Sequence, residues 1–140
     1  MAMKITKMQV WAGNIEDRPG GLAAVLEPLA QAGANLDCVI ARRQAPGSGQ
    51  GVVFLTPVKG KKAQAAATGA GLKAAANIAT LRVEGGNKAG MGAKMGRAIA
   101  DAGINVRGVS ACVLGNKFVA YLGFDNVADA DKAAKVLKKL

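Results

Sequence analysis

Histidine is absent from this chain of 140 residues, and cysteine and the aromatic residues are scarce. Without histidine, the most common general base and most zinc sites are excluded. The two cysteines, Cys38 and Cys112, lie far apart in the sequence and do not have the spacing of metal ligands, so we expect two buried thiols in a reduced, cytoplasmic protein. No catalytic residue, metal site or cofactor is predicted, and we expect a protein that is not an enzyme.

Long apolar runs and acidic residues are also few. No run of about 20 apolar residues is present, so no membrane span and no membrane partner are predicted. The chain has 19 basic and 9 acidic residues, a net charge of +10. The lysines are scattered, and those of the final segment "DADKAAKVLKKL" have the spacing of the solvated face of a helix, which favours surface charge over a nucleic-acid footprint.

An internal repeat is the main positive signal. When the chain is shifted by 70 residues, "PGGLAAVLEPLAQAGANLDCVIA" aligns with "AGMGAKMGRAIADAGINVRGVSA", with eight identities over positions 20 to 41 and no gap. The identities include Gly20/Gly90, Gly33/Gly103 and Asn35/Asn105. Alanine richness explains some matches, but the glycines and asparagines indicate a duplicated unit.

Each repeat has the same pattern of elements. In the first, the strand "KITKMQVWAG" precedes a helix over about 20–32, two strands joined by "QAPGSGQ", a helix "GKKAQAAAT" and a short strand "LKAAA". The second repeats this order with a shorter turn, "GNK", but ends where its fourth strand is expected. We therefore expect two units, residues 1–76 and 77–140. The missing strand is either absent or supplied by another segment or another subunit.

The order strand–helix–strand–strand–helix–strand predicts an α+β fold: two ferredoxin-like βαββαβ sandwiches in tandem, each with an antiparallel sheet and helices on one face. The stretch "DRPGGLAAVLEPLAQAGANLD" goes further, because it resembles the ACT domain, a small-molecule-sensing module of amino-acid biosynthetic enzymes. Its features here are Pro19-Gly20 before the helix and Gly33-Ala34-Asn35 after it. The second copy is similar to the ACT units of aspartokinases. Together the two copies cover nearly the whole chain.

The resemblance implies an amino-acid site at an interface between units, formed by the loop after the first strand and the start of the second. Carried over by position, the ligand-binding residues are Asp17, Arg18, Gly20, Gly21, Leu22 and Asn35 in the first repeat, and Asn87, Lys88, Gly90, Met91, Gly92 and Asn105 in the second. A helix N-terminus suits a carboxylate, and a missing Cβ lets that carboxylate approach the backbone. We assign this role first to Gly20 and Gly90, because this glycine is common to both repeats, whereas Gly21 is interpreted as local looseness.

Structural alternatives stay open for these residues. Asp17 is also a candidate helix cap, the glycines are candidates for a tight entry or close packing, and the asparagines are candidates for simple turn residues. The second repeat departs from the pattern, because Ala89 replaces the proline and Asn87 replaces Asp17. Its loop holds four glycines between residues 85 and 92, so the two sites need not bind alike.

The sequence therefore predicts a non-catalytic regulatory protein that binds an amino acid or a related small carboxylate at paired ACT-like units. A homodimer is expected, because an unpaired sheet edge invites pairing, and a regulated enzyme is a possible partner. The alternative is a nucleic-acid-binding ferredoxin-like protein. It is disfavoured, because Phe118 and Tyr121 are three residues apart and so face opposite sides of a strand.

Overall fold

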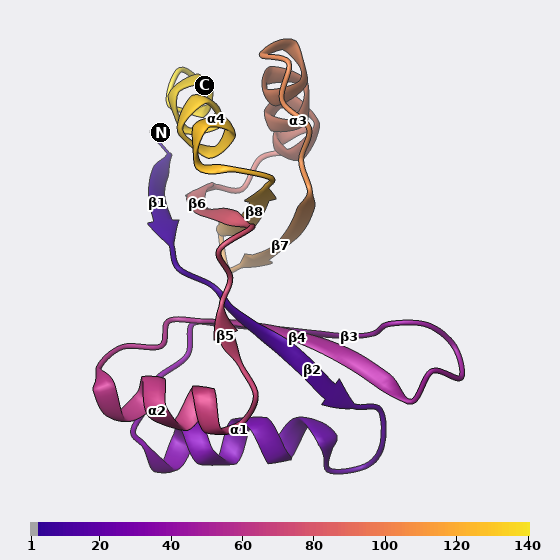
Figure 1. Ribbon diagram of the computed structural model, residues 1–140. Coiled ribbons are helices and arrows are strands. Elements are labelled where there is room, and N and C mark those ends of the chain that lie inside the picture. The colour runs from indigo at the N-terminus through magenta and orange to yellow at the C-terminus, as the bar shows by residue number, and fades with distance from the viewer. Residues whose placement is uncertain (1–2) are drawn as a thin grey trace. The chain divides into compact units, whose positions relative to one another are not determined.

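The computed structural model describes residues 3–140, which form two units (Figure 1). Each unit has its own hydrophobic core. The first unit is Gln9–Ala75, and the second combines residues 3–8 with Ala76–Leu140. Each unit has a four-stranded antiparallel sheet with two helices on one face. The predicted pair of ferredoxin-like α+β sandwiches is confirmed.

In the first unit, the strand order is β3-β4-β2-β5. Val25 and Leu29 of the first helix and Ala63 and Ala67 of the second are buried in its core. They pack with Val53 and Leu55, which lie on one of the two central strands, Gln50–Thr56. Its elements are β2 (Trp11–Glu16), α1 (Gly21–Gln31), β3 (Cys38–Arg43), β4 (Gln50–Thr56), α2 (Lys61–Gly69) and β5 (Lys73–Ala74).

In the second unit, the strand order is β1-β6-β8-β7. Met95 and Ile99 of one helix pack with Leu81, Leu122 and Phe124 of the sheet. Its elements are β1 (Lys4–Met8), β6 (Ala79–Gly86), α3 (Met91–Asp101), β7 (Gly108–Leu114), β8 (Lys117–Phe124) and α4 (Val127–Leu137).

The N-terminal strand requires a correction to the expected boundaries of 1–76 and 77–140. The segment expected to be one strand, "KITKMQVWAG", is divided between the units: β1 pairs antiparallel with β6, and β2 pairs with β4. Ile5 lies opposite Val83 and packs against the core of the second unit, and Lys7 forms an ion pair with Asp131 of α4. The missing fourth strand of the second repeat is therefore supplied by the start of the same chain.

The expected burial of the two thiols is also wrong. Cys38 is half-buried and Cys112 is exposed. Cys112 pairs in register with Val119, on the face of the sheet opposite to the pair Ala111 and Ala120. Because β7 is an edge strand and this face carries no helix of the unit, the thiol is not covered.

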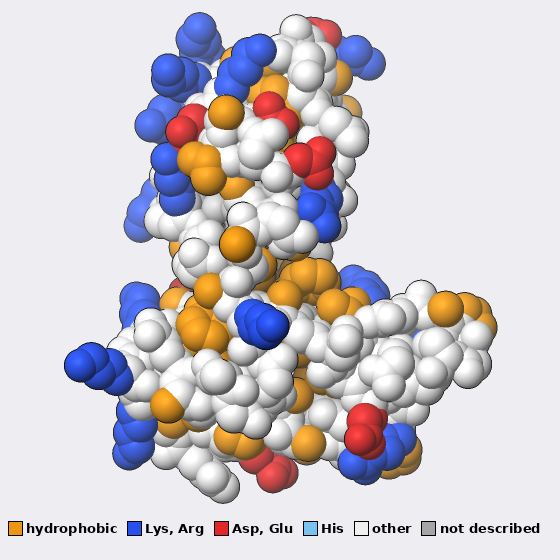
Figure 2. Space-filling view, viewed as in Figure 1, with side chains coloured by type: hydrophobic (Ala, Val, Ile, Leu, Met, Phe, Trp, Pro, Cys, Tyr) orange, Lys and Arg blue, Asp and Glu red, His pale blue; other side chains and the backbone are white. Residues whose placement is uncertain are grey.

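The final helix has the amphipathic character expected from its sequence. Ala130, Ala133 and Leu137 are buried, whereas Lys132, Lys135, Lys138 and Lys139 are exposed. Lys and Arg side chains appear over both units in Figure 2, among neutral and acidic ones. No helix within residues 3–140 is both long enough and apolar enough to span a bilayer.

Candidate functional site

The loop before α3 places two polar side chains beside the start of that helix. Gly90 precedes the helix in a left-handed conformation, with φ of 83°. The Asn87 backbone N–H donates to the carbonyl of Asn116 (2.9 Å), and the Met91 N–H donates to the carbonyl of Lys88 (3.2 Å). These bonds hold the loop against the β7–β8 turn and bring Asn87 and Lys88 to the N-terminal end of α3.

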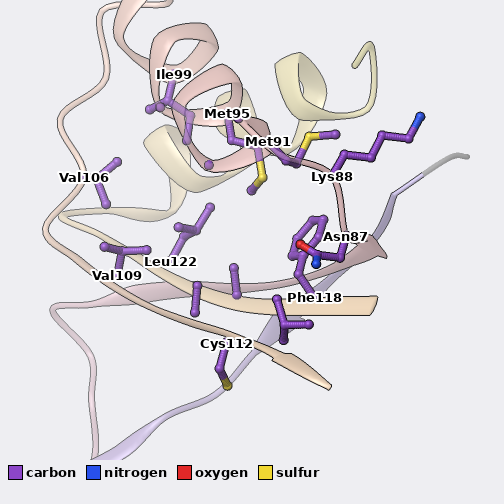
Figure 3. A pocket seen from close by; sticks show the side chains of 16 residues that line it. Asn87, Lys88, Met91, Met95, Ile99, Val106, Val109, Cys112, Phe118 and Leu122 are labelled. Atoms are coloured by element: carbon purple, nitrogen blue, oxygen red, sulfur yellow. The ribbon is translucent and has the colours of Figure 1, made fainter. Parts of the chain in front are cut away.

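A cavity of about 390 Å³ opens between α3 and the sheet of the second unit (Figure 3). This volume lies at the lower end of the range of pockets that bind small molecules. Five of the twelve predicted ligand-binding residues line it, all from the second repeat: Asn87, Lys88, Gly90, Met91 and Gly92. The further lining residues are Met95, Gly96, Ile99, Val106, Val109, Ala111, Cys112, Val113, Phe118, Ala120 and Leu122.

The cavity is apolar along its length and polar at one end. Met95 and Ile99 of α3 face Val109 and Leu122 of the sheet, whereas Asn87 and Lys88 lie at the end beside Phe118 (Figure 3). The Lys88 side chain is exposed and forms no ion pair with any described residue. Among the described residues that line the cavity, none is acidic.

Two glycines of α3 create this space. The 70-residue repeat aligns Gly92 with Leu22 and Gly96 with Leu26. In the first unit, Leu26 packs against the core, whereas a Cβ built on Gly92 or Gly96 would meet no heavy atom within 4 Å. The facing strand shows the consequence: Val109 is 64% exposed, whereas its counterpart Val39 is 41% exposed.

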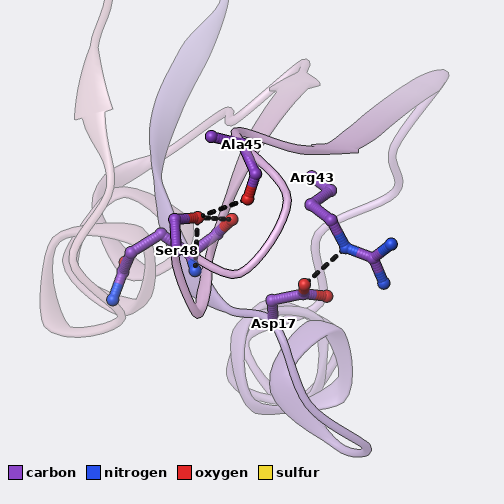
Figure 4. Close-up of polar contacts among 5 residues, drawn as sticks. Asp17, Arg43, Ala45 and Ser48 are labelled. Carbon is purple, nitrogen blue, oxygen red and sulfur yellow. Dashed lines mark hydrogen bonds and ion pairs between the residues drawn. The ribbon is translucent and has the colours of Figure 1, made fainter.

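In the corresponding loop of the first unit, the charged side chains already form ion pairs within that unit. Arg43 Nε donates to Asp17 Oδ2 at 2.5 Å (Figure 4), and Arg18 forms an ion pair with Glu16. The hydrogen bond to Asp17 and the charge of that carboxylate raise the pKa of Arg43 above its ordinary value. The Asp17 N–H also donates to the carbonyl of Gly49 (3.0 Å), which ties the loop to the β3–β4 turn. The interpretation of Asp17 as a helix cap is wrong, because α1 has no side-chain cap.

The glycines at the two helix starts have different physical roles. Gly20 and Gly90 both adopt left-handed backbone angles, with φ of 86° and 83°, which explains their recurrence without a ligand. Gly21 is not loose: it is buried, and a Cβ there would lie 2.0 Å from the carbonyl oxygen of Glu16. The first unit therefore needs Gly21 for close packing of α1 against the end of β2.

The two predicted asparagines lie far from the loops that they were expected to join. Asn35 follows α1 and Asn105 follows α3, whereas the predicted loop residues precede these helices. Each helix has 11 residues and so spans roughly 16 Å. Asn105 does not line the cavity, and both asparagines are exposed.

The sequence-based interpretation missed the body of the cavity. Its inner residues, such as Met95, Val109 and Val113, were assigned only to a helix face and a strand. The signal was nevertheless present in the repeat, because the pairs Leu22/Gly92 and Leu26/Gly96 replace a large side chain with none at two positions one helical turn apart.

Phe118 and Tyr121 of β8 do point to opposite sides of the sheet, as predicted. Phe118 lies at the cavity and packs against the core, whereas Tyr121 accepts a hydrogen bond from Arg82 Nη1 (3.1 Å) on the other face. They form no shared platform on which successive bases could stack.

No family model matches this chain, and no curated protein matches it in sequence. The solved structures do contain similar folds. The ligand-free regulatory subunit of aspartate kinase from Thermus thermophilus has a TM-score of 0.70 at 19% identity, covering 99% of this chain and 96% of that one. Protein BT0572 from Bacteroides thetaiotaomicron has a TM-score of 0.78 at 19% identity, with 98% and 89% covered.

A larger enzyme contains the same fold as one part. Aspartokinase III from E. coli, solved with aspartate and ADP, has a TM-score of 0.59 at 15% identity, and the match covers 99% of this chain but 32% of the enzyme. The chain therefore shares the tandem ferredoxin-like fold of the regulatory subunits and domains of aspartate kinase.

Proposed function

We propose that this chain is a non-catalytic regulatory protein that binds an amino acid or a related small carboxylate. The observation that carries the proposal is the α3–β7 cavity, which is apolar within and has Lys88 and Asn87 at one end. Ligand pockets typically combine apolar walls with a few polar groups that fix orientation. The shared fold with regulatory subunits of aspartate kinase supports a regulatory role over a catalytic one.

Regulation would follow from the position of the cavity beside an edge strand. Val109 and Val113 line the cavity and belong to β7, which lies at the edge of its sheet. A ligand held there contacts the strand whose free edge is available to a second copy or to an enzyme. Binding would therefore shift the association of the protein, provided that its affinity differs between the free and associated forms.

Isothermal titration calorimetry against the proteinogenic amino acids and small carboxylates tests the proposal. We expect saturable binding by the wild-type chain and its loss in Gly96→Leu, because the new side chain occupies the cavity. Lys94→Leu is the matched control, because it adds the same side chain two residues earlier, on the opposite side of the helix. Absence of any binding by a folded wild-type protein would contradict the proposed function.

A further inference from the structure

The charged groups around the cavity distinguish between two classes of carboxylate. A free amino acid carries an α-ammonium as well as an α-carboxylate, and burying an unpaired charge is costly. Lys88 offers a cation for the carboxylate, but none of the described lining residues is an aspartate or glutamate that could pair with the ammonium. The repeat makes this difference specific: the position of Asn87 is held by Asp17 in the first unit.

We propose that the second unit takes an aliphatic monocarboxylate without an α-ammonium, such as a branched 2-oxo acid, in the α3–β7 cavity. This inference rests on the proposed function and narrows the class of its ligand. The aliphatic body lies between Met95 and Ile99 on one side and Val109 and Leu122 on the other. The carboxylate lies at the Asn87 end, where the flexible stem of Lys88 lets its ammonium donate to it.

The first unit does not share this site. Leu22 and Leu26 occupy the positions of the two cavity glycines, and Arg43 and Glu16 already pair with the loop charges of Asp17 and Arg18. In the first unit, Leu26 packs against the core at the position where Gly96 leaves open space in the second unit. The expected stoichiometry is one ligand per chain.

The ammonium is tested by two ligands with the same carboxylate and isobutyl group, leucine and α-ketoisocaproate, of which only leucine carries an α-ammonium. In calorimetric titrations of the full chain, α-ketoisocaproate should bind at least about tenfold more tightly than leucine, the difference expected for one unpaired polar group. Asn87→Asp, which copies the first unit, should reduce or reverse this preference. Lys88→Met should weaken α-ketoisocaproate by about tenfold or more, because it removes a charge-assisted hydrogen bond.

The outcomes distinguish a failure of the inference from a failure of the proposed function. Equal or tighter binding of leucine by the wild-type chain overturns the inference but leaves the proposed function standing. The same conclusion follows if the chain binds a different amino acid and does not bind α-ketoisocaproate. It also follows if α-ketoisocaproate binds tightly and Gly96→Leu leaves its affinity unchanged. If no amino acid or carboxylate binds, the proposed function fails together with the inference. Both loop variants alter exposed side chains, and circular dichroism of each variant is the control for folding.

Discussion

At the scale of single residues, the glycine that precedes α3 and the glycines within it have opposite consequences for stability. The backbone conformation requires glycine at position 90, because a φ of 83° is unfavourable for residues with a Cβ. Gly92 and Gly96 have ordinary helical surroundings and open space around them. These two weaken the helix by about 1 kcal/mol each relative to alanine, and both line the cavity.

This contrast predicts opposite effects for two alanine substitutions. Gly90→Ala should lower the free energy of unfolding by about 1–2 kcal/mol, because it forces a Cβ into the left-handed region. Gly92→Ala should raise it by about 0.5–1 kcal/mol, because it removes a flexible residue from the helix. Urea denaturation measures both. A stabilising Gly90→Ala would contradict the backbone role assigned to this glycine.

At the scale of elements, β1 shows how one strand can serve a unit distant in sequence. Its residues pair with β6, from Lys4 opposite Glu84 to Met8 opposite Thr80, and the ion pair of Lys7 with Asp131 fastens it to α4. The strand completes the sheet edge that the second repeat lacks. The stability of the second unit therefore depends on the first residues of the chain.

Ile5→Ala tests this dependence. The change should destabilise the second unit by about 2 kcal/mol, at the lower end of the range for Ile→Ala because the side chain is only partly buried. Hydrogen exchange should accelerate in β6 and β8 but not in β2 and β4. Thr6→Ala, at an exposed neighbouring position, is the matched control. Equal acceleration in both units would contradict the assignment of β1 to the second.

Most elements could be predicted from the sequence, and the exceptions have physical reasons. The helices and hairpins are marked by apolar spacing and by glycines with positive φ, such as Gly33, Gly103 and Gly115. The division between β1 and β2 is not marked, because inward-facing residues keep the same alternation through Ile5, Trp11 and Ile15 on both sides of the break.

The candidate site was predictable only at its mouth. Asn87, Lys88 and Gly90 follow from the position of a helix start, which sequence patterns reveal well. The depth of the cavity depends on what faces α3 across the sheet, and this is a property of tertiary packing. The asparagines were misplaced relative to the loops because a strand that follows a helix begins at the far end of that helix.

At the scale of the whole molecule, the edge strand β7 carries exposed apolar side chains. Leu114 is 83% exposed and Val113 is 52% exposed. The missing strand of the second repeat does not require a partner, because β1 supplies it. The expectation of a homodimer now rests on β7, since unpaired apolar edges are sites of pairing between chains.

Sedimentation equilibrium of the wild-type chain should reveal a dimer, and Leu114→Lys should weaken it by about tenfold or more, because a lysine on an edge strand opposes pairing. Val127→Lys changes another exposed apolar residue, on α4, and should leave association unchanged. A wild-type chain that remains monomeric at high concentration would refute this interpretation of the edge.

The central claim is that the ligand cavity lies between α3 and β7 of the second unit. Methyl NMR of methionine labelled with carbon-13 tests it most directly, because Met91 and Met95 line the cavity, whereas Met8 lies in β1 and does not. During titration with α-ketoisocaproate, the ε-methyl signals of Met91 and Met95 should shift together and saturate, and that of Met8 should remain in place. Saturable binding that leaves the Met91 and Met95 signals unmoved would contradict the account.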